Sequence, residues 1–478
     1  MNGHAAEGAK AAGPPLPLRD EFVVPTMREV KASKVAVELA DAGCTYMCGN
    51  SLGLMSKRTK QLVEEELAVW ATRGVEGHFD HPHGRNWKDI ADLVTPHFAQ
   101  IVGAKESEVA CMGTLTANLH LMINSFYKPT RERYRILCED HAFPSDQYAF
   151  ATQVAAHGFD PDDAVLALAP RPGEFTLRTE DILRTLAEQG DTVALVLFSG
   201  VQYYTGQLFA VAEVTAAARA AGCAVGWDLA HAAGNVPLRL HDWGPDFAVW
   251  CTYKYLNSGP GGIAGLFVHE RWADLPIRQA GWWGHDRATR FAMPPRFAAI
   301  RGAQGFQQSN PSALATAALL GALAPFAAAG YMAPLRARSL ALTGRLEALL
   351  HRSRFWVPVA RAAAFGQGAK EEQQQKVGVT SITPADPAQR GAQLSLLFVP
   401  AGRGVMPRVL AGLEARGVIV DARRPDVIRV APAPLYNTME DVERAAAAIE
   451  EVLVEVDAEG LPPVEAVVAA GGVEVEGA

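Results

Sequence analysis

The stretch DFAVWCTYKYLNSGPGGIAGLFVHE, residues 246–270, places Lys254 inside an apolar and aromatic run that otherwise predicts a buried segment. A charged ammonium is costly to bury unless it is paired or neutralised. Two explanations are open. The methylene chain could lie on apolar surface while the ammonium reaches water. Alternatively, Lys254 is desolvated because it works as a neutral amine, which is a nucleophile.

Size and composition limit what this chain is. It has 478 residues, of which 49% are hydrophobic and 20% charged, and this predicts one large domain and a smaller one. The net charge is −8 and no block of Lys/Arg stands out, which argues against nucleic acids and acidic membranes as partners. No apolar run approaches the roughly 20 residues of a membrane span, and the N-terminus does not resemble a secretory signal. A cytoplasmic location is expected.

The six cysteines agree with that location. None forms a C-x-x-C pair and several stand in strand-like apolar runs, so we expect reduced core thiols and no structural zinc. A histidine-rich stretch at residues 78–83 suggests a metal, but no helix or strand register would bring those side chains together. The sequence therefore predicts no metal site.

Apolar strands alternate with amphipathic helices through the first two thirds of the chain. Strands are expected near residues 133–140, 192–200 and 223–230, and helices near residues 64–74, 117–127, 179–190 and 211–222. Such alternation, with continuous apolar strands, predicts an α/β fold whose mostly parallel sheet is covered by helices on both faces.

The pattern changes towards the C-terminus. Helices are expected at residues 332–352 and 405–417, and strands near 377–384, 392–400 and 427–432, which suits a small α+β domain. We place the large domain at residues 48–322 and the small domain at residues 1–47 and 323–478. Composition predicts mobile tails at residues 1–19 and 458–478, and a surface loop at 364–378.

Two polar features follow predicted strands. At residues 112–126, Gly113 and two threonines open a helix, and free N–H groups at a helix start suit a phosphate. A simple threonine N-cap explains the same pattern. In the stretch EDHAFPSDQY, Phe143 could cover a planar ring and Asp146 could meet a cation, or the turn could only cap the next helix.

Three further features lie at expected strand ends. Ser199 supplies a hydroxyl before a glycine, and Asp228 ends a very apolar strand, where an acid needs a cationic partner. A carboxylate opposite a pyridine nitrogen would keep that ring protonated, as an electron sink requires. A helix-capping aspartate followed by a core histidine, His231, is the competing explanation. Tyr253 adds a phenol beside Lys254, and the following glycines let the backbone pass close to a ligand.

In this order, a phosphate cradle, an aromatic cover, a buried acid and a lysine form the sequence layout of fold-type-I pyridoxal 5′-phosphate (PLP) enzymes. A lysine amine is ordinarily charged at cellular pH, and only a desolvated one is readily neutral. The second explanation for Lys254 is therefore favoured: it is buried because it carries PLP as an imine.

Longer motifs resemble kynureninase over roughly residues 40–455. They are CGNSLGLMS (48–56), HAFPSDQYA (141–149), FSGVQYYTGQ (198–207), the segment 226–265, GWWGHD (281–286) and IRVAPAPLYN (428–437). Kynureninases are PLP-dependent homodimers that hydrolyse L-kynurenine, or its 3-hydroxy derivative, to anthranilate or 3-hydroxyanthranilate and L-alanine. That reaction belongs to tryptophan catabolism and de novo NAD biosynthesis. The resemblance implies the same activity for this chain.

The resemblance also implies residue roles. It places Leu115 and Thr116 at the phosphate, Phe143 on the pyridine ring, and Asp146 and Asp228 near the ring nitrogen. Lys254 and Tyr253 are the implied catalytic residues, Lys254 as the residue that forms the Schiff base. The other implied cofactor contacts are Pro144, Ser145, Ser199, His231, and, from a neighbouring subunit, Trp282 and Asn310.

The substrate contacts are implied in the same way. Arg429 would bind the substrate α-carboxylate with its two-pronged guanidinium. His78 and Asn310 resemble the polar pair beside the substrate ring, with Ser51 close by. This implies that the 3-hydroxyl is accepted.

Two rival functions remain. An aminotransferase or a cysteine desulfurase shares the fold type, but a desulfurase needs a mobile cysteine, and no cysteine here stands in a late Gly/Ser-rich loop. A catalytically silent PLP-fold binding protein is the other rival. The presence of Lys254, Asp228 and Arg429 weighs against it.

Overall fold

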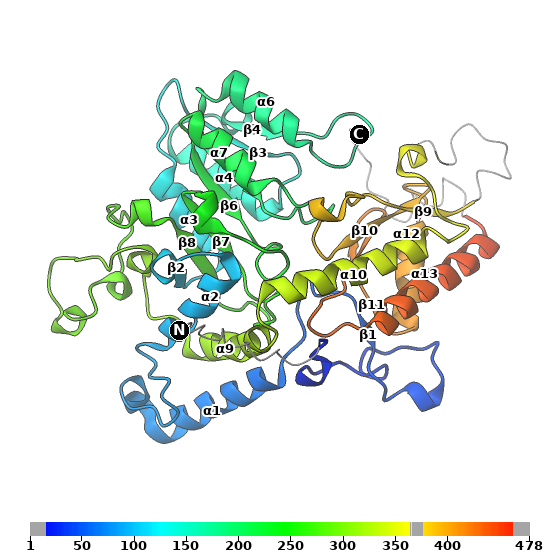
Figure 1. Ribbon diagram of the computed structural model, residues 1–478, viewed down its shortest axis with the longest axis horizontal. Helices are drawn as coiled ribbons and strands as arrows, with labels where there is room; N and C mark the ends of the chain where they lie inside the picture. Colours follow the sequence, from blue (N-terminus) through cyan, green and yellow to red (C-terminus); the bar gives the residue numbers. More distant parts are fainter. Residues whose placement is uncertain (1–15, 364, 366–375, 462–478) are drawn as a thin grey trace, which may run out of the picture.

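The structure, a computed structural model, describes residues 16–363, 365 and 376–461 (Figure 1). Most of the stretch predicted as a polar surface loop lies outside the described residues. So do residues 1–15 and 462–478 of the two predicted tails.

A seven-stranded sheet forms the centre of the larger part of the molecule, in the order β2-β8-β7-β6-β5-β3-β4. Its strands are β2 (Val109–Cys111), β3 (Arg135–Glu139), β4 (Val165–Leu168), β5 (Val193–Ser199), β6 (Ala224–Asp228), β7 (Phe247–Trp250) and β8 (Gly265–Val268). The run β7-β6-β5-β3-β4 is parallel, and β8 is antiparallel to both of its neighbours. The predicted mostly parallel sheet is confirmed.

Helices cover both faces of this sheet (Figure 1). The helices of this larger part of the molecule are α1 (Lys57–Arg73), α2 (Thr95–Val102), α3 (Leu115–Phe126), α4 (Pro144–Ala156), α5 (Pro161–Ala164), α6 (Thr179–Gln189), α7 (Val211–Ala220), α8 (Leu240–Trp243) and α9 (Ala313–Ala328). Of these, α1 packs against α9 and not against the sheet. Alternate residues of β5 enter different cores. Leu195 and Leu197 pack in the core that contains α3 and α4, whereas Val196 and Phe198 pack in the core that contains α6 and α7. A strand buried on both faces must be apolar throughout, as the sequence predicted.

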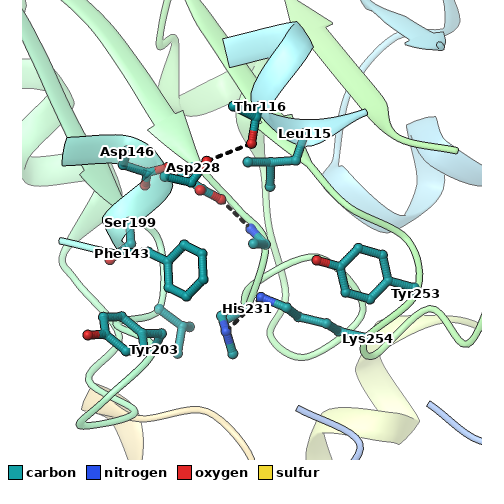
Figure 2. A pocket seen from close by; sticks show the side chains of 13 residues that line it. Leu115, Thr116, Phe143, Asp146, Ser199, Tyr203, Asp228, His231, Tyr253 and Lys254 are labelled. Atoms are coloured by element: carbon teal, nitrogen blue, oxygen red, sulfur yellow. Dashed lines mark hydrogen bonds between the residues drawn. The ribbon is translucent and has the colours of Figure 1, made fainter. Parts of the chain in front are cut away.

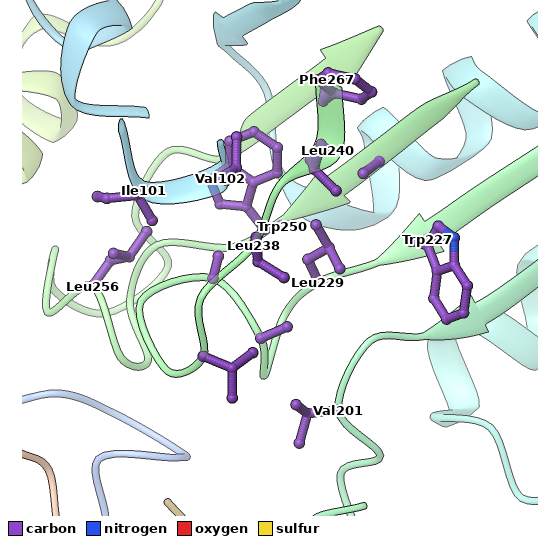
Figure 3. Close-up of a cluster of buried hydrophobic side chains, with 14 of the residues drawn as sticks. Ile101, Val102, Val201, Trp227, Leu229, Leu238, Leu240, Trp250, Leu256 and Phe267 are labelled. Carbon is purple, nitrogen blue, oxygen red and sulfur yellow. The ribbon is translucent and has the colours of Figure 1, made fainter. Parts of the chain in front are cut away.

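One of these cores extends under the carboxyl ends of β6 and β7 (Figure 3). Trp227 and Trp250 come from the two strands, while Leu229 and Leu256 come from the turns that follow them, and all four side chains are fully buried. Turns with such buried anchors are rigid supports for the polar residues that they carry.

A smaller unit follows α9. Its antiparallel sheet has the order β12-β13-β10-β9 and is packed against three helices. The elements are α10 (Met332–Leu350), β9 (Gly378–Ser381), β10 (Leu394–Val399), α12 (Val405–Ala415), β12 (Asp421–Arg423), β13 (Val427–Val430) and α13 (Met439–Glu459). The N-terminal β1 (Thr45–Tyr46) joins it by pairing with β11 (Val418–Ile419). The predicted division at residues 48 and 322 stays a prediction. The helix α9 runs across residue 322 without a break.

The tails are shorter than composition predicted. Leu18 is buried and donates its N–H to the Leu435 carbonyl over 2.7 Å, and Arg19 pairs with Asp441 over 2.7 Å. At the other end, α13 continues to Glu459. Pro, Gly and Ala around Leu18 and Arg19 predict a tail, but the buried leucine and the ion pair of the arginine fix this segment.

Within the described residues, no single helix is long and apolar enough to cross a membrane. The pair α9 and α10 meets the length and composition test together, but the two helices meet at 80°.

The packing of β6 on β7 gives a stability prediction. A Cβ atom at Gly226 would lie 2.2 Å from Cζ of Phe247, whereas one at Gly344 in α10 would meet nothing within 4 Å. We expect Gly226→Ala to lower the free energy of unfolding by about 1–3 kcal/mol through overpacking. Gly344→Ala, the matched control, should raise it by roughly 0.5–1 kcal/mol. Urea unfolding followed by circular dichroism measures both, and equal midpoints for Gly226→Ala and wild type would contradict the packing argument.

Candidate active site

The carboxyl ends of the parallel strands form one wall of a pocket of about 530 Å³, including its open mouth (Figure 2). Asp228 ends β6 and Ser199 ends β5, and the two residues are paired in register. Lys254 lies in the turn after β7. Open α/β sheets bind ligands at this edge. The predicted site residues that line the pocket are Leu115, Thr116, Phe143, Ser145, Asp146, Ser199, Asp228, His231, Tyr253 and Lys254.

Lys254 directs its amine into the pocket. Its Nζ lies 2.9 Å from Nε2 of His231 and 5.8 Å from the ring centre of Phe143 (Figure 2). Its carbonyl accepts the Asn257 N–H over 3.0 Å. Gly53 lies against this turn, where a Cβ would be 2.4 Å from the Lys254 carbonyl oxygen. The backbone of Lys254 is therefore held on two sides while its side chain faces the pocket.

His231 is a neutral base beside that amine. Burial lowers the pKa of His231 well below its ordinary value, and the nearby Lys254 lowers it further. A neutral imidazole that accepts at Nε2 carries its proton on Nδ1. That Nδ1 atom is buried and has no hydrogen-bond partner among the described residues.

Two buried carboxyl groups, Asp146 and Asp228, face the pocket. Burial raises the pKa of both, and the Asp228 charge raises that of Asp146 further. Asp228 accepts the Ala230 N–H over 2.6 Å and lies near Lys254, and both contacts favour its charged form. Asp146 therefore holds the proton and Asp228 the negative charge. Asp146 Oδ1 has no partner among the described residues.

Two helices begin at the pocket. The N-caps of α3 and α4, Thr114 and Phe143, make no side-chain capping hydrogen bond. The hydroxyls of Thr116 and Ser145 join the two helix starts over 2.7 Å. Uncapped N–H groups with adjacent hydroxyls bind anions, and phosphate in particular.

These residues fit PLP. A lysine amine suits the aldehyde, a charged acid suits the pyridine nitrogen, and two helix starts suit the phosphate. Phe143 is 41% exposed, which leaves a ring free to cover a planar ligand. The unpartnered buried atoms of His231 and Asp146 would gain a partner from such a polar ligand.

The other predicted residues lie outside this pocket. Trp282 is 46% exposed and Asn310 is exposed, while His78 and Ser51 are half-buried. Pro144 begins α4 without lining the pocket. Arg429 is buried, forms an ion pair with Asp421, and donates to the Tyr203 carbonyl over 2.6 Å.

Sequence reasoning missed three pocket residues, Val201, Tyr203 and Ala230. It also missed Glu139, the buried last residue of β3. Tyr203 stands in the quoted motif FSGVQYYTGQ directly after a strand, and that position was a usable signal. Glu139 offered none, because an acid before a turn is common.

Two clusters of titratable residues lie apart from the pocket. His81, in the histidine-rich stretch, bonds to buried Glu66 over 2.9 Å. One carboxylate oxygen of Glu108 and one ring nitrogen each of His241 and His269 lie within 4.8 Å of one another, as the ligands of one metal ion would. The carboxylate of Glu108, however, already accepts from His241 Nδ1 at 3.0 Å, and the two imidazoles are stacked. The hydrogen bond and the stacking account for the contacts of this cluster without a metal ion.

Comparisons with known proteins agree with this geometry. The chain matches the family models "Kynureninase C-terminal domain" over residues 359–449 and "Aminotransferase class-V" over residues 79–276. It is 48% identical to a kynureninase from Yarrowia lipolytica, with 91% of this chain and 98% of the relative covered. It is 53% identical to a kynureninase from Myxococcus xanthus, with 85% and 89% covered.

Solved structures share the fold at low identity. A mutant of the lyase C-DES, with glycine linked covalently to its PLP cofactor, has a TM-score of 0.68 at 17% identity, covering 86% of this chain and 97% of that one. A cysteine desulfurase from Thermococcus onnurineus has a TM-score of 0.66 at 16% identity, covering 86% and 95%. The likeness to these enzymes extends to the fold alone.

The buried charge of Asp228 gives a binding prediction. In Asp228→Asn the hydrogen bond to a protonated pyridine nitrogen loses its charge, at a cost of about 1.5–3 kcal/mol. We expect the Kd for PLP, measured by absorbance titration of the apoprotein, to rise roughly 10- to 100-fold. Asp191→Asn makes the same change on the surface and should leave it unaltered. An unchanged Kd in Asp228→Asn would contradict the assignment.

Proposed function

The chain belongs to the kynureninase family, and on that premise we propose that the pocket around Lys254 is where its PLP-dependent hydrolysis of kynurenine takes place. The reaction cleaves the Cβ–Cγ bond of L-kynurenine, releasing anthranilate and L-alanine, and the same cleavage of 3-hydroxy-L-kynurenine gives 3-hydroxyanthranilate. One observation carries the assignment. The Lys254 amine enters a pocket whose wall holds the buried carboxyl group of Asp228.

PLP, when bound, supplies an electron sink for negative charge at the substrate carbon atoms. In the proposed arrangement Asp228 keeps a proton on the ring nitrogen and Phe143 covers the ring. Thr116 and the N–H groups of α3 and α4 hold the phosphate. His231 and Ser199 complete the set of contacts.

The protein's own groups move the protons. Lys254 Nζ takes the proton from Cα, and the neutral His231 accepts at Nε2 beside it. Burial raises the pKa of Tyr253, so this phenol stays protonated and acts as a donor. Water adds to the γ-carbonyl carbon and the Cβ–Cγ bond breaks. The acyl fragment leaves as anthranilate, while Cβ takes a proton and becomes the methyl carbon of alanine.

Arg429 is the proposed partner of the substrate α-carboxylate. The guanidinium is held by Asp421 and by the Tyr203 carbonyl, and its Nε has no partner among the described residues. Tyr203 lines the pocket, so Arg429 lies directly behind the wall. His78, Asn310 and Ser51 are the proposed contacts of the substrate ring and its 3-hydroxyl.

A homodimer with shared sites accounts for the residues that lie outside the pocket. Trp282, Phe291 and Phe79 are 46%, 45% and 51% exposed, and Phe291 lies 5.6 Å from each of the other two rings. Contiguous exposed aromatic rings of this kind mark a protein interface. A second copy docked on this face would cover these aromatic rings. Trp282 and Asn310 of the first copy would then reach the pocket of the second copy. We further propose a cytoplasmic location and the domain division at residues 48 and 322.

The function is tested by product analysis. Lys254→Ala should abolish the release of alanine from kynurenine and the visible absorption of bound PLP, since Lys254 is the one lysine among the described residues that lines the pocket. Lys34→Ala, on the exposed surface, is the control and should retain both. Parallel assays with kynurenine and 3-hydroxykynurenine measure substrate choice. Keto-acid-dependent amino exchange without alanine release would instead favour an aminotransferase.

Shared sites are tested by complementation. Lys254→Ala and Asn310→Ala proteins should each be inactive, but mixed dimers should contain one intact site. Unfolding and refolding an equal mixture should restore about a quarter of wild-type turnover, because half of the dimers are mixed and each has one good site. Two Lys254→Ala preparations mixed in the same way are the control. A mixture that stays inactive would contradict a shared site.

A further inference from the structure

Glu139 is a buried acid directly behind the pocket wall. It ends β3, and its neighbour in the sheet is β5, which ends at Ser199; β6, ending at Asp228, comes next. Glu139 is 4% exposed and does not line the pocket, whereas Ser199 does. Ser199 therefore stands between a carboxyl group that faces the ligand and one that does not.

The Glu139 carboxyl is bonded to Ser199 through three contacts. Oε1 accepts the Ser199 hydroxyl over 2.5 Å, and the Ser199 N–H approaches Oε1 at 3.2 Å and Oε2 at 3.3 Å. No ion pair of Glu139 occurs among residues 16–363, 365 and 376–461. A buried carboxylate without a cation is costly. If Glu139 only accepted hydrogen bonds from Ser199, a neutral glutamine would do so at a lower desolvation cost.

The groups that face Glu139 are acidic or neutral. Asp228 comes from β6, Asp146 from α4, and the phenol of Tyr203 from the segment after β5, while Cys138 precedes Glu139 in β3. The neighbouring β4 offers only Leu168 opposite it. The pKa of Glu139 is raised to about 7, chiefly by burial and in smaller part by the Asp228 charge, while its bonds to Ser199 lower it.

We propose that Glu139 is a positioning residue of the cofactor site, which sets the direction of the Ser199 hydroxyl according to its own protonation state. The charged carboxylate accepts a hydrogen bond from the Ser199 hydroxyl, so the Ser199 oxygen offers only lone pairs to the pocket. A protonated Glu139 is a weaker acceptor, and the Ser199 hydroxyl is then free to donate towards the ligand. This inference rests on the proposed function in taking PLP as that ligand.

Glu139 thereby couples the environment of the bound cofactor to pH through one hydroxyl group. A hydroxyl that donates to a ligand atom and one that accepts from it stabilise different charge distributions in the ligand. The absorption of PLP depends on that distribution, so the coupling is visible without any substrate. A residue that only supports the sheet would alter stability and leave the spectrum's pH dependence in place.

The test is a pH titration of the visible absorption of the holoprotein between about pH 6 and about pH 8. Wild type should show a transition with a midpoint near pH 7, because the pKa of Glu139 is raised to about 7, chiefly by burial. Glu139→Gln keeps the shape and cannot titrate, so its transition should disappear. Glu188→Gln, the same change at an exposed position, should behave as wild type.

Ser199→Ala separates this route from a direct effect of charge. If Glu139 acts through the hydroxyl, Ser199→Ala should also abolish the transition, and the double variant should equal either single one. A transition that persists in Glu139→Gln or in Ser199→Ala overturns the proposal, as does its absence from wild type. Ser199→Ala keeps the test decisive even if Glu139→Gln fails to fold.

The two proposals fail in different ways. The titration needs PLP but no kynurenine. A wild type that cleaves kynurenine while Glu139→Gln titrates normally would overturn this inference alone. A wild type that binds no PLP would overturn both.

Discussion

The buried negative charge of Asp228 is the constraint on which the rest of the site depends. An isolated carboxylate is expensive at full burial, and here it is stabilised by the Ala230 N–H and by the neighbouring Lys254. Asp146 remains protonated because a second charge beside the first would cost still more. The pocket therefore has an anionic wall and, opposite it, an amine. Such a field favours a ligand with a cationic ring and a carbonyl carbon, which is the description of PLP.

The parallel sheet makes this arrangement possible. Its strands all end at one edge, so residues far apart in the chain, Ser199 and Asp228, become neighbours in register. The apolar anchors behind them, such as Trp227 and Leu256, leave the turns little freedom. Rigid turns hold the charged groups at short distances without the entropy cost that mobile loops would carry.

The sequence predicted much of this because strand ends are easy to recognise. Continuous apolar strands and a lysine in an apolar run led to the sheet, Asp228 and Lys254. Contacts between segments left no such mark. The protonation of Asp146 depends on Asp228 from another strand, and the buried position of Glu139 depends on the end of β5. The roles expected of Trp282 and Asn310 came from resemblance, and on one chain these residues lie outside the pocket.

The same fold serves enzymes that act on sulfur, so the reaction must be chosen by residues other than the strand ends. A desulfurase requires a cysteine that reaches the substrate, and the six free cysteines here are all buried and none lines the pocket. In this chain Tyr203 lines the pocket wall instead. Arg429 donates to the Tyr203 carbonyl and forms an ion pair with Asp421. These three residues join the large sheet to the small one. If Arg429 binds the substrate carboxylate as proposed, substrate selection depends on how the small antiparallel sheet meets the segment after β5, while the strand ends supply chemistry common to the fold.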